Sequence, residues 1–197
     1  MKKNKILITG TSRGIGEALA IHFLNAGWEV NGFSRHKNES IKKVFRKKGN
    51  YQETIGDLSN IKDVRRFLKK SLGEIEHAEY DKIVLINNAG VLEPIKSIRD
   101  IETEEMVYNL KVNVLGTASI ISLFLHELKY IALRKIIINV SSGAAKSPYS
   151  GWASYCASKA AIDMLTQCIY LEEKGSQNPC HIYAIAPGIV ETKMQET

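Results

Sequence analysis

The sequence is poor in cysteine and proline. It holds three cysteines and four prolines in 197 residues, and Cys156, Cys168 and Cys180 show no Cys-x-x-Cys spacing. An odd number of cysteines without that spacing argues against a disulfide framework and against a cysteine-based metal site. With 14 glycines and 24% charged residues, the composition also excludes collagen-like, low-complexity and disordered chains.

Long apolar runs are equally scarce. The longest, at 112–125, is interrupted by Asn113, Gly116, Thr117 and Ser119, whereas a helix needs about 20 apolar residues to cross a bilayer. The N-terminal stretch MKKNKILITG runs straight into a glycine motif, with no small-residue cleavage site after it. We therefore expect a soluble, reduced, cytoplasmic domain with no membrane partner.

Basic residues outnumber acidic ones only in the first quarter of the chain. The formal net charge is +6, but residues 1–50 alone carry +8 and the rest carries −2. We interpret the basic stretch at 42–48 as a solvated helix face; a polyanion-binding patch and attraction of an anionic cofactor are the alternatives. Because no nucleic-acid recognition module accompanies it, we expect no nucleic-acid partner.

Apolar strands alternate with amphipathic helices along the chain. Strands are predicted at 5–9, 29–34, 51–55, 82–86, 135–140 and 181–186. Helices are predicted at 15–26, 40–48, from a cap at Ser59 or Asn60 to Leu72, 104–128 and 152–174. No linker or repeat intervenes. This alternation predicts an α/β fold, with a parallel sheet and right-handed crossovers, in a single domain spanning 1–197.

A glycine-rich segment, TGTSRGIG at 9–16, follows the first strand and opens the first helix. Gly10 would permit the sharp turn, Gly14 would let the backbone approach a phosphate, and Gly16 would let the helix pack closely. The free N–H groups and positive dipole end of the helix suit a pyrophosphate. This context favours a dinucleotide site over glycines that merely end a strand.

The end of the second strand indicates which dinucleotide is accepted. An acidic residue there would bind the ribose 2′-hydroxyl, whereas an arginine would accept a 2′-phosphate. Here Ser34 and Arg35 follow one another with no carboxylate before Glu39, and Arg13 is expected nearby. The pattern favours NADP(H). The alternative is that Arg35 is an ordinary exposed turn residue.

Tyr155 and Lys159 stand four residues apart at the start of a predicted helix, so both side chains lie on one face. A neighbouring ammonium, with the positive nicotinamide, would lower the tyrosine pKa from about 10 and make the phenol a useful acid. Ser142, at the end of the preceding strand, could donate a hydrogen bond to a substrate carbonyl. A Tyr-x-x-x-Lys pattern alone is more often structural.

Asn113 is a poor helix former in the apolar stretch VNVLG. Its amide would bind a backbone group or a water in a proton relay; a satisfied buried asparagine is the alternative.

Together these motifs resemble the short-chain dehydrogenase/reductase family. The resemblance runs from end to end, through TGTSRGIG at 9–16, the DL pair at 57–58, NNAG at 87–90, Asn113, Ser142, Tyr155 with Lys159, and PGIVET at 187–192. Segments 141–161 and 166–168 are most similar to sepiapterin reductase-like enzymes and bacterial benzil reductases. The resemblance implies a Rossmann-type, doubly wound parallel sheet in a three-layer α/β/α sandwich.

The resemblance also implies roles for individual residues. Tyr155 would be the acid, Lys159 would bind the nicotinamide ribose and depress the tyrosine pKa, Ser142 would polarise the carbonyl and Asn113 would hold a relay water. The implied NADP(H) contacts, besides Tyr155 and Lys159, are Gly10, Ser12, Arg13, Gly14, Ile15, Gly16, Ser34, Arg35, Asp57, Leu58, Asn88, Ala89, Gly90, Val190 and Thr192. Asp57 and Leu58 would contact adenine, residues 88–90 the adenosine ribose, and Val190 and Thr192 the carboxamide. No metal is implied.

The family usually continues past the PG motif into a substrate lid, a further helix and a seventh strand. These 197 residues stop just inside that region, so we expect either a chain that is truncated there or one that lacks the substrate lid and an edge of the sheet. Relatives pair through the two long helices, here 104–128 and 152–174, which makes a homodimer an expectation.

The substrate is expected to be a small carbonyl compound. Pro148, Tyr149 and Trp152 precede the catalytic tyrosine, and an aromatic wall there would stack on a flat aryl ketone or a pterin. Packing of Trp152 on the next helix or on a second subunit is the alternative. The resemblance implies NADPH-dependent reduction of a ketone, such as one carbonyl of an α-dicarbonyl or a hydroxyketone. A non-catalytic NADP(H)-binding sensor or scaffold is the competing interpretation.

Overall fold

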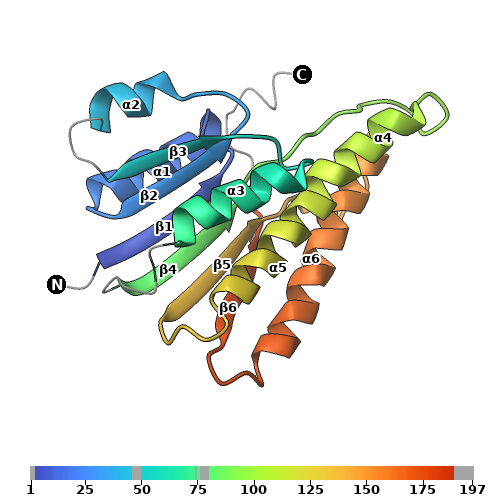
Figure 1. The fold of residues 1–197 in the computed structure, drawn as a ribbon. Helices are drawn as coiled ribbons and strands as arrows, with labels where there is room; N and C mark the ends of the chain where they lie inside the picture. Colours follow the sequence, from blue (N-terminus) through green and yellow to red (C-terminus); the bar gives the residue numbers. More distant parts are fainter. Residues whose placement is uncertain (1–2, 46–49, 74, 76–79, 189–197) are drawn as a thin grey trace.

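The computed structural model describes residues 3–45, 50–73, 75 and 80–188. Within these residues six strands form one parallel sheet (Figure 1), in the order β3-β2-β1-β4-β5-β6. They are β1 (Lys3–Thr9), β2 (Glu29–Ser34), β3 (Tyr51–Ile55), β4 (Tyr80–Asn87), β5 (Arg134–Val140) and β6 (Cys180–Ile185). All six predicted strands are confirmed.

The helices are α1 (Gly14–Asn25), α2 (Glu39–Phe45), α3 (Ile61–Leu72), α4 (Thr103–Leu110), α5 (Thr117–Glu127) and α6 (Ala153–Glu173). Asn60, not Ser59, caps α3, because its side-chain oxygen accepts a hydrogen bond from the backbone N–H of Lys62. The basic stretch at 42–48 overlaps the end of α2, and its last three residues lie outside the described part of the chain.

Helices cover both faces of the sheet, which confirms the doubly wound, three-layer arrangement. Because successive side chains of a strand point to opposite faces, Ile6 and Ile8 of β1 join one core cluster and Leu7 joins another. The first cluster includes residues of α1 and α2, and the second includes residues of α3, α5 and α6. The view in Figure 1 has α3, α5 and α6 lying over the sheet.

The strand order reverses between β1 and β4: β2 and β3 extend the sheet on one side, β5 and β6 on the other. In open α/β sheets, ligands bind outside the carboxyl ends of the strands at such a switch point. The carboxyl ends of β1, β4 and β5 are therefore where the site is expected, and each is followed by one of the sequence motifs.

The helix predicted over 104–128 is not a single regular α-helix. Between α4 and α5 lies a stretch of π-helix, η2 (Lys111–Gly116), with Asn113 at its centre. One wider turn rotates the following side chains relative to a regular helix, and such turns are frequent at functional sites. Gly116 at its end packs against the backbone of Leu58.

The continuous helical stretch Thr103–Glu127 is long and apolar enough to cross a membrane by length and composition, with a mean hydropathy of 1.3 over its most apolar window. The sequence-based expectation concerned uninterrupted apolar runs, whereas this criterion averages hydropathy over a window that includes polar residues. The core helix of a soluble protein passes the same test. Here the stretch packs against α3 and α6 and buries two asparagines, Asn109 and Asn113.

Candidate active site

The glycine-rich loop makes a tight turn between β1 and α1. Gly10 has φ +79°, in the left-handed region that favours glycine, and its N–H donates to the carbonyl oxygen of Phe33 at 2.7 Å. Gly16 is buried against the carbonyl oxygen of Gly10, where a side chain would collide with it. Its role is thus close packing of the helix on the loop, whereas we predicted packing on the sheet.

The first turn of α1 begins at the glycine-rich loop. Arg13, at the N-cap position, makes no side-chain capping hydrogen bond. Arg13 and Gly14 are exposed, and Ser12 and Ile15 are half-buried. An uncapped helix N-terminus with an exposed arginine beside it fits a pyrophosphate group.

Two asparagines hold the loop in place. Asn88, after β4, donates its side-chain amide to the carbonyl oxygens of Thr9 (3.0 Å) and Gly10 (3.4 Å). The hydroxyl oxygen of Thr9 in turn accepts from the backbone N–H groups of Asn88 and Ala89, both at 3.0 Å. The side chain of Asn88, predicted to line the adenosine ribose, therefore turns toward the glycine-rich loop.

The second asparagine that holds the glycine-rich loop is Asn38, which was not predicted from the sequence. It is 3% exposed and donates its side-chain amide to the carbonyl oxygen of Thr11 and to Oε1 of Glu17, both at 2.9 Å. Its own Oδ1 accepts from the N–H of Ile41, so the same residue caps α2. An asparagine shortly before a predicted helix was the available signal, but its contacts with the loop are not visible in sequence.

The other residues predicted to bind the cofactor differ in their exposure to solvent. Arg35 is exposed and donates from Nη1 to the hydroxyl oxygen of Tyr108 at 2.8 Å. Ser34 is 5% exposed, and its hydroxyl donates to the carbonyl oxygen of His36 at 2.7 Å, so it faces the turn rather than solvent. Asp57 is half-buried and Leu58 buried. Val190 and Thr192, predicted to bind the carboxamide, lie outside the described residues.

Tyr155 and Lys159 lie on the same buried face of α6. The ammonium nitrogen of Lys159 lies 5.6 Å from the centre of the Tyr155 ring, and it donates to the carbonyl oxygen of Val140, at the end of β5, at 2.8 Å. Lys159 is only 7% exposed, and this burial lowers its pKa from 10.5 to about 8. Near neutral pH it remains mostly protonated, as a buried cation beside a phenol.

The pKa of Tyr155 differs from the expectation. Burial raises it above its usual value, and the hydrogen bond with Ser142 only partly offsets that effect. The predicted lowering of the pKa by Lys159 is therefore not found; the spacing of the two residues could not reveal how deeply the phenol is buried. A raised pKa keeps the phenol protonated. Ser142 is half-buried after β5, and its Oγ accepts from the N–H of Ala144 at 3.2 Å.

Both groups of the Asn113 side-chain amide bind protein atoms. Its Oδ1 accepts from the N–H of Val91 at 2.9 Å, and its Nδ2 donates to the carbonyl oxygen of Val91 at 2.8 Å and to Ser158 Oγ at 3.1 Å. The predicted contact with a backbone group is thus present, on the segment that follows β4. Ser158 ties this asparagine to α6, three residues after Tyr155.

Gly90 joins the NNAG segment to this cluster. An atom at its Cβ position would lie 3.2 Å from Oδ1 of Asn113 and 3.7 Å from Nζ of Lys159. Asn109, which the sequence analysis missed, fixes the next residues by donating to the carbonyl oxygens of Val91 (3.2 Å) and Glu93 (2.7 Å). The NNAG segment, η2 and α6 therefore meet at one point.

Aromatic residues line the approach to Tyr155. The ring centres of Trp152 and Tyr155 are 5.7 Å apart in an edge-to-face arrangement, and those of Tyr149 and Trp152 are 5.1 Å apart. Leu92, Ala144 and Tyr155 form a small buried cluster on which Trp152 and Cys156 pack. Trp152 thus packs on α6, as one of our two interpretations held, and as a half-buried ring it also keeps a solvent-facing side.

The predicted catalytic residues are brought together from η2, the end of β5 and the start of α6. The glycine-rich loop is tied to Asn88 and Ala89 of the NNAG segment, and Gly90 of that segment lies next to Asn113 and Lys159. A phenol kept protonated by burial next to a buried ammonium can give a proton to an oxygen that becomes negatively charged. The loop can hold the phosphates of a dinucleotide. Together these features suit transfer of a hydride and a proton.

Known proteins are similar to this chain in sequence and in fold. The family described as short chain dehydrogenase matches residues 4–197. The chain is 37% identical to benzil reductase ((S)-benzoin forming) of Bacillus cereus, over 96% of this chain and 77% of that protein. It is 29% identical to the NADPH-dependent pterin aldehyde reductase of Arabidopsis thaliana, over 96% and 76%.

Among solved structures, ElxO with NADP bound superposes with a TM-score of 0.82 at 28% identity, covering all of this chain and 77% of that one. The match of the family to nearly the whole chain agrees with the fold and with the motifs from which it was predicted. The protein is an oxidoreductase of the short-chain dehydrogenase/reductase family.

Proposed function

We propose that the protein is an NADPH-dependent carbonyl reductase that converts a ketone to an alcohol, with Tyr155 as the acid. The observation that carries the proposal is the convergence of Ser142, Tyr155 and Lys159 at the end of β5, beside the glycine-rich loop. The loop fits the pyrophosphate because the first turn of α1 is uncapped. Arg35 and Arg13, exposed beside it, favour a 2′-phosphate.

Each residue has a separate task in the proposed reaction. When bound, the nicotinamide supplies a hydride to the carbonyl carbon. The hydroxyl of Ser142 donates a hydrogen bond to the carbonyl oxygen and orients it. Tyr155 gives its proton to that oxygen, which completes the alcohol and leaves a phenolate.

Lys159 supports this step electrostatically. Its ammonium, 5.6 Å from the ring centre, stabilises the phenolate in a site where burial strengthens the attraction between the two charges. Before the reaction, burial holds the Tyr155 pKa high and so keeps the proton available. Asn113 positions the segment after β4 through both groups of its amide. In the proposed reaction it also holds a water that relays the proton.

We propose a vicinal dicarbonyl or a hydroxyketone as the substrate. Trp152, edge-on to Tyr155 and tilted against the ring of Tyr149, offers an apolar surface to an aryl or pterin ring. Support also comes from the names of two relatives, a benzil reductase and a pterin aldehyde reductase.

A panel of carbonyl compounds tests the proposal. Oxidation of NADPH, and separately of NADH, is followed by absorbance with benzil, sepiapterin, aliphatic α-dicarbonyls and simple aldehydes. We expect turnover with NADPH and the α-dicarbonyls. Turnover with aldehydes but with no α-dicarbonyl would contradict the substrate class. Tight NADPH binding without any turnover would favour the alternative, a non-catalytic NADP(H)-binding sensor.

A further inference from the structure

A tyrosine on α4 joins two of the residues assigned to the adenosine end of the cofactor. The hydroxyl oxygen of Tyr108 accepts a hydrogen bond from Nη1 of Arg35 at 2.8 Å and lies 3.5 Å from Oδ2 of Asp57, to which it donates. Arg35 follows β2, Asp57 follows β3 and Tyr108 lies on α4, so these contacts join three segments that are distant in the sequence. No sequence motif marked Tyr108.

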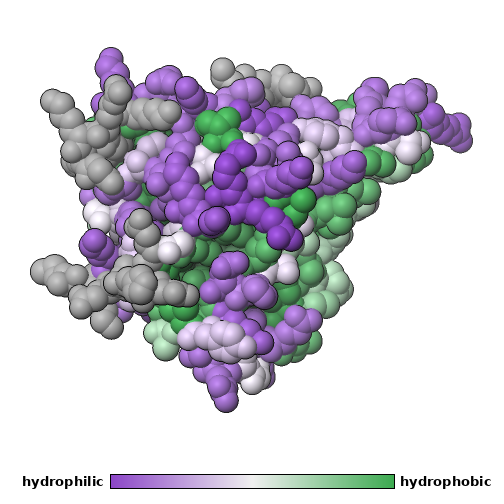
Figure 2. All heavy atoms as spheres, in the orientation of Figure 1, coloured by the Kyte–Doolittle hydropathy of each residue, from purple (hydrophilic) through white to green (hydrophobic). Residues whose placement is uncertain are grey.

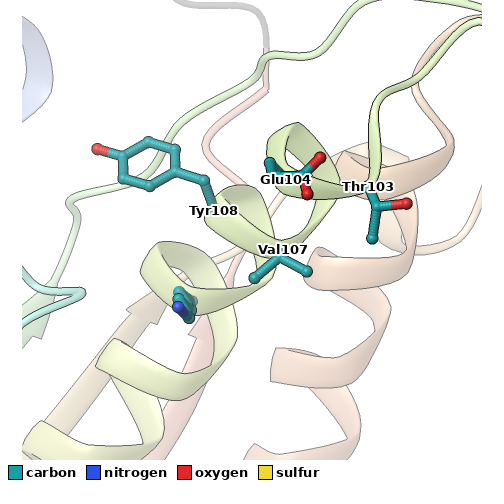
Figure 3. A pocket seen from close by; sticks show the side chains of 5 residues that line it. Thr103, Glu104, Val107 and Tyr108 are labelled. Carbon is teal, nitrogen blue, oxygen red and sulfur yellow. The ribbon is translucent and has the colours of Figure 1, made fainter.

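Tyr108 also lines a depression on the outer face of α4. The depression has a volume of about 280 Å³ and is lined by Thr103, Glu104, Val107, Tyr108 and Lys111. In Figure 3 the Tyr108 ring extends away from Thr103 and Val107, with its hydroxyl at the far end. Most of the depression therefore belongs to the helix surface, while the hydroxyl of this one residue reaches Arg35.

Asp57 gives the chain of hydrogen bonds a fixed end. Its Oδ1 accepts from the N–H of Ser59 at 2.7 Å, and its own N–H donates to Oδ2 of Asp63 at 3.1 Å. The bonds run in one direction, from Arg35 to Tyr108 to Asp57, so each donor polarises the next. The exposed, flexible guanidinium is thus attached through Tyr108 to a rigid turn.

We propose that Tyr108 is a positioning residue for Arg35 and that it sets the preference for dinucleotides carrying a 2′-phosphate; this inference rests on the proposed use of NADP(H). An arginine has five N–H donors, and Tyr108 takes one of them. In the described part of the chain no other side-chain hydrogen bond of Arg35 is found, so the remaining donors can face a phosphate. Because the side chain is already held, it loses less rotamer entropy on binding.

Tyr108 could also weaken the binding of the 2′-phosphate instead of strengthening it. The direction in which the affinity changes on removing its hydroxyl therefore decides between the two effects. If Tyr108 and Asp57 withheld the guanidinium from the phosphate, removing the hydroxyl would strengthen binding. The two effects differ in direction for the same variant, Tyr108→Phe, which keeps the ring and deletes only the hydroxyl.

Isothermal titration calorimetry with adenosine 2′,5′-bisphosphate and adenosine 5′-monophosphate isolates the 2′-phosphate without any turnover. For Tyr108→Phe we expect about fivefold weaker binding of the bisphosphate, because the Arg35 side chain must then be ordered on binding. Binding of the monophosphate should be unchanged. Tyr130→Phe is the matched control, since Tyr130 is 84% exposed and is placed in no site; it should bind both ligands as the wild type does.

A double-mutant cycle tests whether Tyr108 acts through Arg35. In an Arg35→Gln background, Tyr108→Phe should have no further effect on the bisphosphate. A Tyr108→Phe protein that binds the bisphosphate as tightly as the wild type, or more tightly, would overturn the inference while leaving the NADP(H) proposal intact. A wild type that binds both ligands equally would overturn the cofactor choice and the inference with it.

Discussion

The side-chain amide of Asn38 lies 2.9 Å from the carbonyl oxygen of Thr11 and thereby ties the start of α2 to the glycine-rich loop. The same amide donates to Glu17 on α1, and its oxygen caps α2. One buried side chain thus fixes the loop, the helix that follows it and the segment after β2. The shape of the phosphate site depends on a residue outside the glycine motif.

Asn38→Ala should therefore impair stability and dinucleotide binding together. It removes a helix cap and leaves buried polar groups unpaired, which should lower the free energy of unfolding by about 2 kcal/mol. Calorimetry should show weaker NADPH binding. Asn60→Ala removes the equivalent cap of α3 at an exposed position and should cost about 1 kcal/mol without changing NADPH affinity. Equal effects of the two variants on affinity would contradict this role for Asn38.

The buried charge of Lys159 should appear in the pH dependence of stability. The unfolded chain holds this proton up to its ordinary pKa of 10.5, whereas the folded protein releases it near pH 8. Between these values the unfolded state binds more protons, so stability rises with pH. The free energy of unfolding of the wild type, relative to Lys159→Met, should rise across this range by at most about 3 kcal/mol.

Denaturant unfolding at several pH values measures this difference. Replacing the exposed Lys62 by methionine is the control, and the difference between that variant and the wild type should stay flat over the same range. A flat profile for Lys159→Met as well would show that Lys159 is not a buried cation in the folded protein.

Trp152→Leu should distinguish aromatic from aliphatic substrates. Loss of the aromatic surface removes stacking worth about 1 kcal/mol, so kcat/KM for benzil should fall about fivefold to tenfold. The value for butane-2,3-dione, which has no ring to stack, is the internal control and should change much less. An equal fall for both diketones would mean that Trp152 acts only by supporting Tyr155.

A homodimer through the long helices remains a prediction. Figure 2 shows hydrophobic residues gathered over the part of the surface formed by α5 and α6, and Leu115 and Met164 are each 59% exposed. Light scattering should give a mass of about twice 22.0 kDa. Met164→Glu should shift the protein toward the monomer, and Val44→Glu, on α2, should not. A wild-type mass near 22 kDa would contradict the prediction.

The strands and most helices could be predicted because their signals are local. The apolar run KIVLI, for example, is buried along β4 as expected, and Gly10 adopts the positive φ that its motif implies. Likewise, the four-residue spacing of Tyr155 and Lys159 was sufficient to place them on one helical face. In these cases the physical cause lies within a few residues of the chain.

The remainder depended on contacts between distant segments. The π-helix at Asn113 forms where its amide binds Val91, 22 residues away, and no propensity marks it. Tyr108 meets Arg35 across 73 residues. The raised pKa of Tyr155 results from burial, which spacing cannot reveal. Sequence therefore predicted that Tyr155 and Lys159 share one face of α6, but not the residues that hold the surrounding segments in place.

The most direct test compares wild type and Tyr155→Phe for NADPH oxidation with benzil, with NADPH affinity measured beside it. The variant keeps the ring against Trp152 and removes the proton. We predict that the variant still binds NADPH and that its turnover is reduced by a factor on the order of 10² to 10⁴, the usual contribution of a positioned acid. Wild-type activity that survives in Tyr155→Phe would contradict the central claim that this phenol supplies the proton.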